Sequence, residues 1–182
     1  MPRLRIAIAA AGIVAATAVA TPAHAADCAN AGLMPTASNS VQIRQATLCL
    51  LNAERSAHGL RDLRANPRLR RAATSYAHQM ASRDFFSHTS PSGSTPLSRI
   101  TSTRYLSGAR SWAIGENLAW GTGSYATPDG TVRAWMNSAG HRANILSPTF
   151  REIGIGVAHG APVNVAAAAS GATYATDFGS RG

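Results

Sequence analysis

The sequence contains no lysine. All 17 of its basic side chains are arginines, and with only 8 acidic residues the formal net charge is +9 over 182 residues. The exclusive use of arginine is typical of a GC-rich coding sequence rather than of one selected partner. Such a surface favours anionic polymers, for example wall polymers or phospholipid head groups. Because aromatic and basic residues do not interleave, we expect no nucleic-acid partner.

Local signatures of common enzymes are also missing. The sequence has no H-E-x-x-H segment, no cluster of cysteine and histidine, no glycine-rich phosphate loop and no G-x-S-x-G segment. Beyond the N-terminal stretch 6–19, no apolar run approaches the roughly 20 residues that a membrane span requires. We therefore expect no transmembrane anchor, and chemistry, if present, must come from residues distant in the chain.

The N-terminus has the order of a secretory signal peptide. Arg3 and Arg5 precede the uncharged stretch 6–19, and Ala23-His24-Ala25 has the small-x-small form of a cleavage site. We expect residues 1–25 to be removed after Ala25, so that the mature chain is secreted.

The sequence has two cysteines, Cys28 and Cys49. An even cysteine count in an exported protein favours a disulfide, which would tie the N-terminal arm to the first helix. Two unpaired thiols are the alternative. Lipid modification of Cys28 is less favoured, because Ala26-Asp27 is a poor ending for a lipid-attachment motif.

The pattern of the mature chain predicts an irregular arm over 26–40 and one domain over 41–180. Apolar residues at three- and four-residue steps predict helices, and Asn66-Pro67, Thr95-Pro96 and Pro128 are start signals. Alternation predicts a strand over 114–120 and a hairpin of 153–158 with 172–178, joined by a loop that includes 166–169. The helix from Pro128 should break near Ala139-Gly140. The fold class is therefore α+β, with a small antiparallel sheet covered by helices.

Three short segments carry the residues best suited to chemistry: Phe86-Ser87-His88, Gly115-Glu116-Asn117 and Gly140-His141-Arg142. Two imidazoles and a carboxylate are sufficient for metal binding or proton transfer if they meet in space. The alternative interpretation is a buried hydrogen-bond cluster that joins helices to the sheet. The remaining histidines of the mature chain, His58, His78 and His159, receive no site role.

The chain resembles the CAP superfamily, which comprises cysteine-rich secretory proteins, antigen 5 and pathogenesis-related proteins, in its bacterial secreted form. The resemblance covers about residues 46–179. Its motifs are Leu51-Asn52-Ala53-Glu54-Arg55, Phe86-Ser87-His88, Gly115-Glu116-Asn117-Leu118-Ala119, the segment 135–146, the segment 153–157 and the segment 174–179.

This resemblance implies an α–β–α sandwich with a central cleft that in relatives holds two histidines and two acids and can take a zinc ion. By motif, His88 and His141 match the histidines and Glu116 matches one acid. Ser138 stands where relatives carry the second acid. We therefore expect His88, Glu116 and His141 to converge as a tentative Zn²⁺ site, weaker than one with four ligands.

The function we expect is a non-enzymatic binding module for an extracellular or envelope ligand, whether lipid, wall polymer or protein. A peptidase-like extracellular hydrolase is one alternative, since Ser138, His141 and Glu116 could form a Ser–His–Glu set. A lipid or sterol carrier, as implied by some relatives, is another. We expect a monomer.

Overall fold

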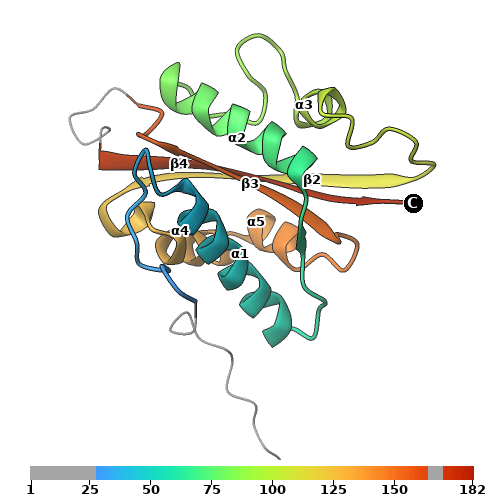
Figure 1. Cartoon of the computed structure of the whole chain (residues 1–182), viewed down its shortest axis with the longest axis horizontal. Helices are drawn as coiled ribbons and strands as arrows, with labels where there is room; N and C mark the ends of the chain where they lie inside the picture. The colour runs from blue at the N-terminus through green and yellow to red at the C-terminus, as the bar shows by residue number, and fades with distance from the viewer. Residues whose placement is uncertain (1–27, 164–169) are drawn as a thin grey trace, which may run out of the picture.

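The computed structural model describes residues 28–163 and 170–182. The predicted signal peptide of residues 1–25 and the loop segment 166–169 lie outside the described residues. Within them, a four-stranded sheet is covered by helices on both faces (Figure 1). The predicted α+β class and the implied α–β–α sandwich are confirmed.

One helical layer holds α1 (Ser40–Ala57), α4 (Pro128–Met136) and α5 (Ala139–Ile145), and the other holds α2 (Pro67–Ser82) and α3 (Pro96–Ser102) (Figure 1). The short 3-10 helix η2 (Gly123–Ala126) follows the second strand. Among the described residues no helix is both long and apolar enough to cross a bilayer.

The sheet order is β1-β3-β4-β2. Strands β2 (Trp112–Thr122), β4 (Gly171–Arg181) and β3 (Glu152–His159) pair antiparallel, as predicted for the hairpin. The prediction of a purely antiparallel sheet was incomplete, because the two-residue strand β1 (Arg64–Ala65) pairs parallel with β3. Two residues are too few to show alternation, so no sequence pattern marks this strand.

The predicted start signals coincide with the starts of α2, α3 and α4. The side chain of Asn66 accepts from the main-chain N–H of Leu69, and Pro67 is the first residue of α2. Gly59 has φ +68° just beyond α1, which suits a glycine after a helix C-terminus. The predicted break near Ala139-Gly140 was displaced: the break falls at 137–138, and both residues belong to α5.

Two glycines let α2 lie directly on the sheet. A Cβ at Gly154 would come within 2.0 Å of the main chain of Leu69, and one at Gly156 within 2.2 Å of the main chain of Ala73. Any side chain here would push the helix away, so these glycines set the distance between the two layers.

A fully buried arginine joins α1 to the loop that follows α5. Arg55 Nε donates to the carbonyl of Arg61 at 2.8 Å, and its Nη1 donates to the carbonyls of Ile145 at 2.6 Å and Ser147 at 3.0 Å. Carbonyl oxygens, rather than a carboxylate, satisfy these hydrogen bonds of the guanidinium. Burial and the charge of Arg151 lower the Arg55 pKa.

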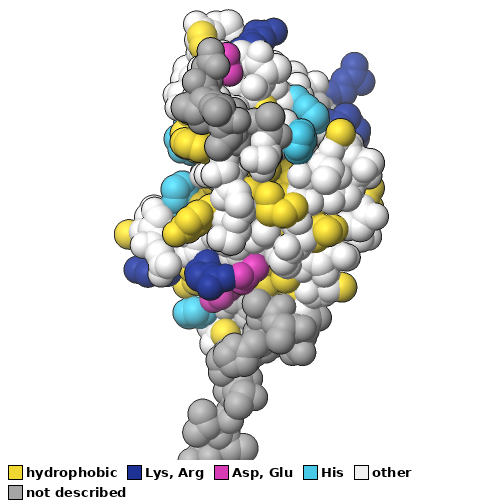
Figure 2. Space-filling model, turned by 90° about the vertical axis from the view of Figure 1, so that its left-hand side faces the viewer, with side chains coloured by type: hydrophobic (Ala, Val, Ile, Leu, Met, Phe, Trp, Pro, Cys, Tyr) yellow, Lys and Arg dark blue, Asp and Glu magenta, His cyan; other side chains and the backbone are white. Residues whose placement is uncertain are grey.

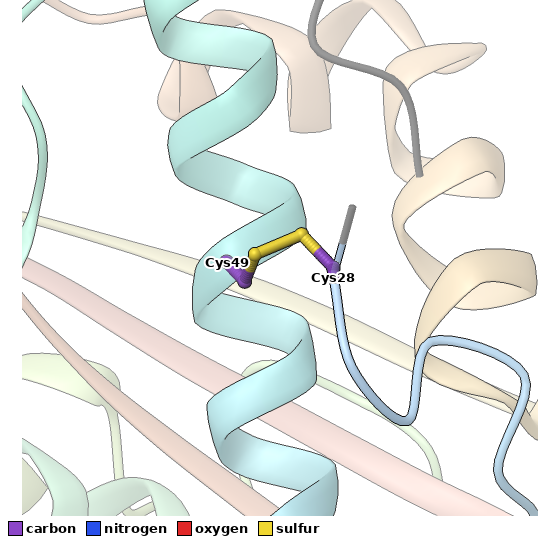
Figure 3. Close-up of a disulfide and its surroundings, with 2 residues drawn as sticks. All are labelled: Cys28 and Cys49. Atoms are coloured by element: carbon purple, nitrogen blue, oxygen red, sulfur yellow. A yellow bond between two sulfur atoms is a disulfide. The ribbon is translucent and has the colours of Figure 1, made fainter. Parts of the chain in front are cut away.

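The predicted disulfide is confirmed: Cys28 and Cys49 are joined by a bond of 2.01 Å (Figure 3). It fastens the irregular arm to the middle of α1. The arm also contacts the start of α4, where the N–H of Asp129 donates to the carbonyl of Ala31 at 2.9 Å. The arm is thus held at both a covalent and a hydrogen-bonded point.

Candidate functional site

Strand β2 carries the acidic residue of the site in its middle. Glu116 is 7% exposed, and its side chain lies on the face of the sheet covered by α2 and α3. The neighbouring Asn117 points to the opposite face, where it bonds to residues of α5. Because adjacent strand residues point to opposite faces, the Gly-Glu-Asn segment contacts both helical layers.

His88 contacts Glu116 directly. Its Nδ1 lies 2.7 Å from Glu116 Oε1, and the His88 side chain is 55% exposed whereas that of Glu116 is 2% exposed. The imidazole therefore lies at the surface and is held from below by a buried carboxylate. A hydrogen bond of this kind fixes the orientation of the ring and leaves Nε2 for another partner.

Arg99, from α3, occupies the second oxygen of Glu116. Its Nη2 lies 2.6 Å from Oε2, and other hydrogen bonds reach the carbonyls of Ser94 and His88. The guanidinium carbon lies 3.3 Å from the centre of the Tyr76 ring, a cation–π contact. The Tyr76 hydroxyl donates to the carbonyl of Ser87, so this cluster also fixes the loop before His88.

His141 approaches the site from α5. Its Nδ1 lies 2.9 Å from the hydroxyl of Ser138, and its carbonyl accepts from Asn117 Nδ2 at 3.0 Å. Burial lowers the pKa of His141, and the charge of His88 lowers it further. The two imidazoles are thus close enough to interact electrostatically, and His141 favours its neutral form.

Asp177 provides a second buried carboxyl group that the sequence analysis missed. It is the residue of β4 paired with Glu116 and is 1% exposed. Its two carboxyl oxygens are buried and make no hydrogen bond of ordinary geometry with the described residues, although, besides burial, an interaction with the Glu116 carboxylate contributes to its raised pKa. Burial raises the pKa of Asp177 well above its ordinary value, the charge of Glu116 raises it further, and Arg99 opposes the effect.

The outer edge of β2 is closed next to the site. Asn144 Nδ2 donates to the carbonyl of Glu116 at 3.2 Å, and Trp135 Nε1 donates to the carbonyl of Leu118 at 2.9 Å. Both donors come from the α4–α5 layer. They satisfy main-chain acceptors that an edge strand otherwise leaves open.

The structure thus brings His88 and Glu116 into contact and places His141 nearby, but the three groups have different partners. Both Glu116 oxygens are engaged, and the described residues contain no group of three or more His, Cys, Asp or Glu side chains arranged to hold a metal ion. Glu116 bonds to His88 rather than to His141, so it does not complete a Ser138–His141–Glu116 relay.

Two of the residues that build the site could have been found from the sequence. Asp177 is an acid within the otherwise uncharged segment 171–180 of a predicted strand, and a charge in a buried strand signals a special environment. Arg99 directly precedes the buried Ile100 in a short helix, which gives a weaker signal. Trp112 and Trp120 of β2 are 49% and 41% exposed.

Comparison with known proteins gives one family. The model of the cysteine-rich secretory protein family (CAP) matches residues 48–172. YkwD of Bacillus subtilis (strain 168) is 39% identical over 107 residues, which is 59% of this chain and 39% of YkwD. The membrane protein YlbC of the same organism is 28% identical over 110 residues, or 60% of this chain and 30% of YlbC. The chain therefore matches well under half of either relative.

Solved structures agree with the fold. An extracellular protein of Bacillus anthracis that contains an SCP domain superposes with a TM-score of 0.55 at 28% identity, covering 77% of this chain and 39% of that one. An outer surface protein of Borrelia burgdorferi gives a TM-score of 0.62 at 21% identity, covering 83% of this chain and 99% of that one.

Proposed function

The chain belongs to the cysteine-rich secretory protein family, and from that premise we propose that it is a secreted binding module whose ligand contacts His88 and His141. The single observation that carries the proposal is the contact of His88 with Glu116 at 2.7 Å, a surface imidazole oriented by a buried carboxylate. An exposed imidazole held in one orientation is available to a ligand.

Two features support action outside the cytoplasm. The disulfide Cys28–Cys49 suits an oxidising compartment. The sequence before Cys28 has the order of a signal peptide. Cleavage after Ala25 would leave Cys28 close to the new N-terminus, where the disulfide holds the arm.

The site is built to present two imidazole nitrogens. Nδ1 of His88 is engaged by Glu116 and Nδ1 of His141 by Ser138, and no described residue forms a hydrogen bond with Nε2 of either ring. Partners on one ring nitrogen that orient the other nitrogen are the usual arrangement around metal-binding histidines. Arg99 neutralises the charge of Glu116 from below, so that a ligand contacts imidazole rather than carboxylate.

A divalent metal bound at this site would have only two protein ligands. His88 and His141 would hold the ion, while Glu116 and Ser138 would orient the rings rather than bind the metal. Zn²⁺ would supply a Lewis-acid centre that polarises a bound ligand. Two protein ligands give weak binding, which agrees with the replacement of the second acid by Ser138.

Titration of the mature protein with Zn²⁺, followed by NMR signals of the histidine rings, tests the proposal. We expect shifts at His88 and His141 and a loss of affinity of about 10- to 100-fold in His88→Ala. His78→Ala is the matched control, because His78 is exposed on α2 and lies outside the site. Absence of any shift at micromolar Zn²⁺ would remove the metal from the proposal and favour a structural hydrogen-bond cluster.

The contact of Ser138 with His141 favours extracellular hydrolysis as a second candidate function. A neutral imidazole 2.9 Å from a hydroxyl can accept its proton when the oxygen attacks an electrophile. Labelling with a fluorophosphonate, in which Ser138 Oγ would displace fluoride from phosphorus, tests this candidate. Labelling that is lost in Ser138→Ala supports it, and an unlabelled wild-type protein rejects it.

A further inference from the structure

A hollow lies at the opposite edge of the sheet from the histidine site. It runs between α1 and α2 over the edge formed by β1 and β3, and its volume is about 280 Å³. Its apolar lining includes Val41, Leu48, Pro67, Ile153 and Ile155. We call it the edge groove. Its size is just under the usual range for drug-sized ligands, so it suits a short segment with one or two side chains inside.

The floor of the edge groove is an incompletely paired strand edge. Strand β1 pairs only with Glu152 and Ile153 of β3, and the N–H of Asn66 donates to the carbonyl of Ile153 at 2.8 Å. Pro67 then begins α2, so the chain of β1 turns away. By alternation, Ile155 is the next residue of β3 whose main-chain groups point toward this edge. It is 5% exposed and lines the groove, and no strand of the described residues pairs with it.

Arginines without acidic partners line the mouth of the edge groove. Arg44 of α1 and Arg70 of α2 line it, and Arg64 of β1 is exposed beside it. The ion pairs of the described residues use other arginines, namely Arg99, Arg133 and Arg181. Arg44 donates only to the hydroxyl of Ser40, and burial and the charge of Arg70 both lower its pKa.

Two like charges close together are unfavourable unless an anion joins them. Basic side chains also occur elsewhere on the molecule. On the end of the sheet seen in Figure 2 they stand mostly apart, and the one near the middle lies against acidic side chains. Most other described arginines also lack an acidic partner. The edge groove differs in that Arg44 and Arg70 stand beside an apolar lining and an open strand edge.

We propose that the edge groove binds an extended acidic peptide segment of a partner protein, which adds to the sheet beside β3 where β1 ends. Each observation accounts for one part of such a ligand. The outward main-chain groups of Ile155 would pair with the peptide backbone, the apolar walls would take a hydrophobic side chain, and Arg44 and Arg70 would bind carboxylates. A fatty acid could contact the apolar walls and pair with the arginines, but it could not form main-chain hydrogen bonds with the strand edge.

A capped synthetic peptide of about five residues, with glutamate and valine in equal number, is a suitable probe for strand addition. We expect saturable binding to the mature protein, NMR shifts of the Ala65 and Ile155 amides, and slower hydrogen exchange of the Ile155 amide. The double variant Arg44→Gln/Arg70→Gln should bind at least about tenfold more weakly, since two charge-assisted contacts are lost. Arg83→Gln, an exposed arginine at the far end of α2, is the control and should bind like the wild type.

Three further probes decide the class of ligand. Lysine in place of glutamate should abolish binding, and N-methylation of alternate peptide amides should weaken it by blocking strand pairing. Equal binding of either peptide would overturn the proposal, as would saturable binding of dodecanoate in the edge groove without binding of the acidic peptide. His88→Ala should leave peptide binding unchanged, which separates this inference from the function proposed for the histidine site.

Discussion

Glu116 and Asp177 are directly paired residues of β2 and β4, so two carboxyl side chains lie side by side on one face of the sheet, both buried. Their surroundings are unequal. Glu116 has His88 and Arg99 as partners, whereas the Asp177 oxygens make no hydrogen bond of ordinary geometry with the described residues. Two neighbouring buried carboxyls cannot both ionise cheaply, and Asp177 keeps its proton.

The raised pKa of Asp177 predicts the pH dependence of stability. The folded state holds this proton at pH values where the unfolded chain has released it, so the free energy of unfolding falls as pH rises above the ordinary pKa of an aspartate. Asp177→Asn removes this penalty. We expect the variant to gain on the order of 1 kcal/mol at pH 7, and little at pH 4, in urea unfolding.

The exposed acid Asp62 provides the control for that experiment. Asp62→Asn should leave the pH dependence of unfolding unchanged. Destabilisation of Asp177→Asn at pH 7 would contradict a protonated Asp177 and would indicate an ionised carboxylate paired with Arg99.

The lowered pKa of His141 makes the free energy of unfolding change with pH in the opposite direction. Below about pH 6.5 the unfolded chain takes up a proton that the folded site resists, so stability is lost as the pH falls from 7 to 5. His141→Gln should make this part of the stability profile flatter. His78→Gln should not, because His78 is exposed; equal flattening by both variants would refute the assignment to His141.

Because α2 packs so closely on β3, adding one methyl group at this contact should strongly reduce the free energy of unfolding. Gly156→Ala places a Cβ 2.2 Å from the main chain of Ala73, and we expect a loss of about 1–3 kcal/mol or more in unfolding free energy. Gly140→Ala is the control, since nothing lies within 4 Å of its Cβ position and alanine favours the helix. A neutral Gly156→Ala would mean that α2 can shift freely on the sheet.

Arg55 predicts a second large effect. Arg55→Met leaves the carbonyls of Arg61, Ile145 and Ser147 without this donor in the interior, at a cost of about 3–5 kcal/mol in chemical denaturation. Arg55→Lys should recover only part of this loss, because a single ammonium cannot replace the fork of the guanidinium. Full recovery by lysine would show that charge, rather than the fork, is what matters.

Reduction of the disulfide should release the arm. Opening the Cys28–Cys49 loop, with a sequence separation of 21, is expected to cost about 3 kcal/mol in urea unfolding. The amide of Asp129 should then exchange faster with deuterium, because its acceptor Ala31 belongs to the arm. A Cys28→Ser/Cys49→Ser variant should match the reduced protein and be insensitive to reductant. Unchanged stability after reduction would argue that the arm is not coupled to the domain.

Helices with local start signals could be predicted because the signals act within one turn. Asn66 and Pro67 define the start of α2 through hydrogen bonds and backbone angles that need no distant partner. Strand β1 could not be predicted, since it exists only because β3 lies alongside it.

The site shows the same contrast between local signals, which the sequence reveals, and long-range contacts, which it does not. Motifs identified His88, Glu116 and His141, but the hydrogen-bond partners of Glu116 are residues distant in the sequence. The pairing of Glu116 with Asp177 depends on the register of β2 and β4, and a shift of one residue would separate them. The contact with Arg99 depends on how α3 packs over the sheet. Metal or ligand binding at the site therefore remains a prediction for experiment.

The closure of the β2 edge by Asn144 and Trp135 affects how this protein behaves at high concentration. An open edge strand is where one sheet recruits another into growing aggregates. Here Asn144, which also bonds to Asn117, and the core residue Trp135 occupy the carbonyls of Glu116 and Leu118. Substitutions of Asn144 or Trp135 made to accommodate a new ligand would reopen this strand edge and promote polymerisation. Aggregation, rather than ligand affinity, would then limit which substitutions can be used.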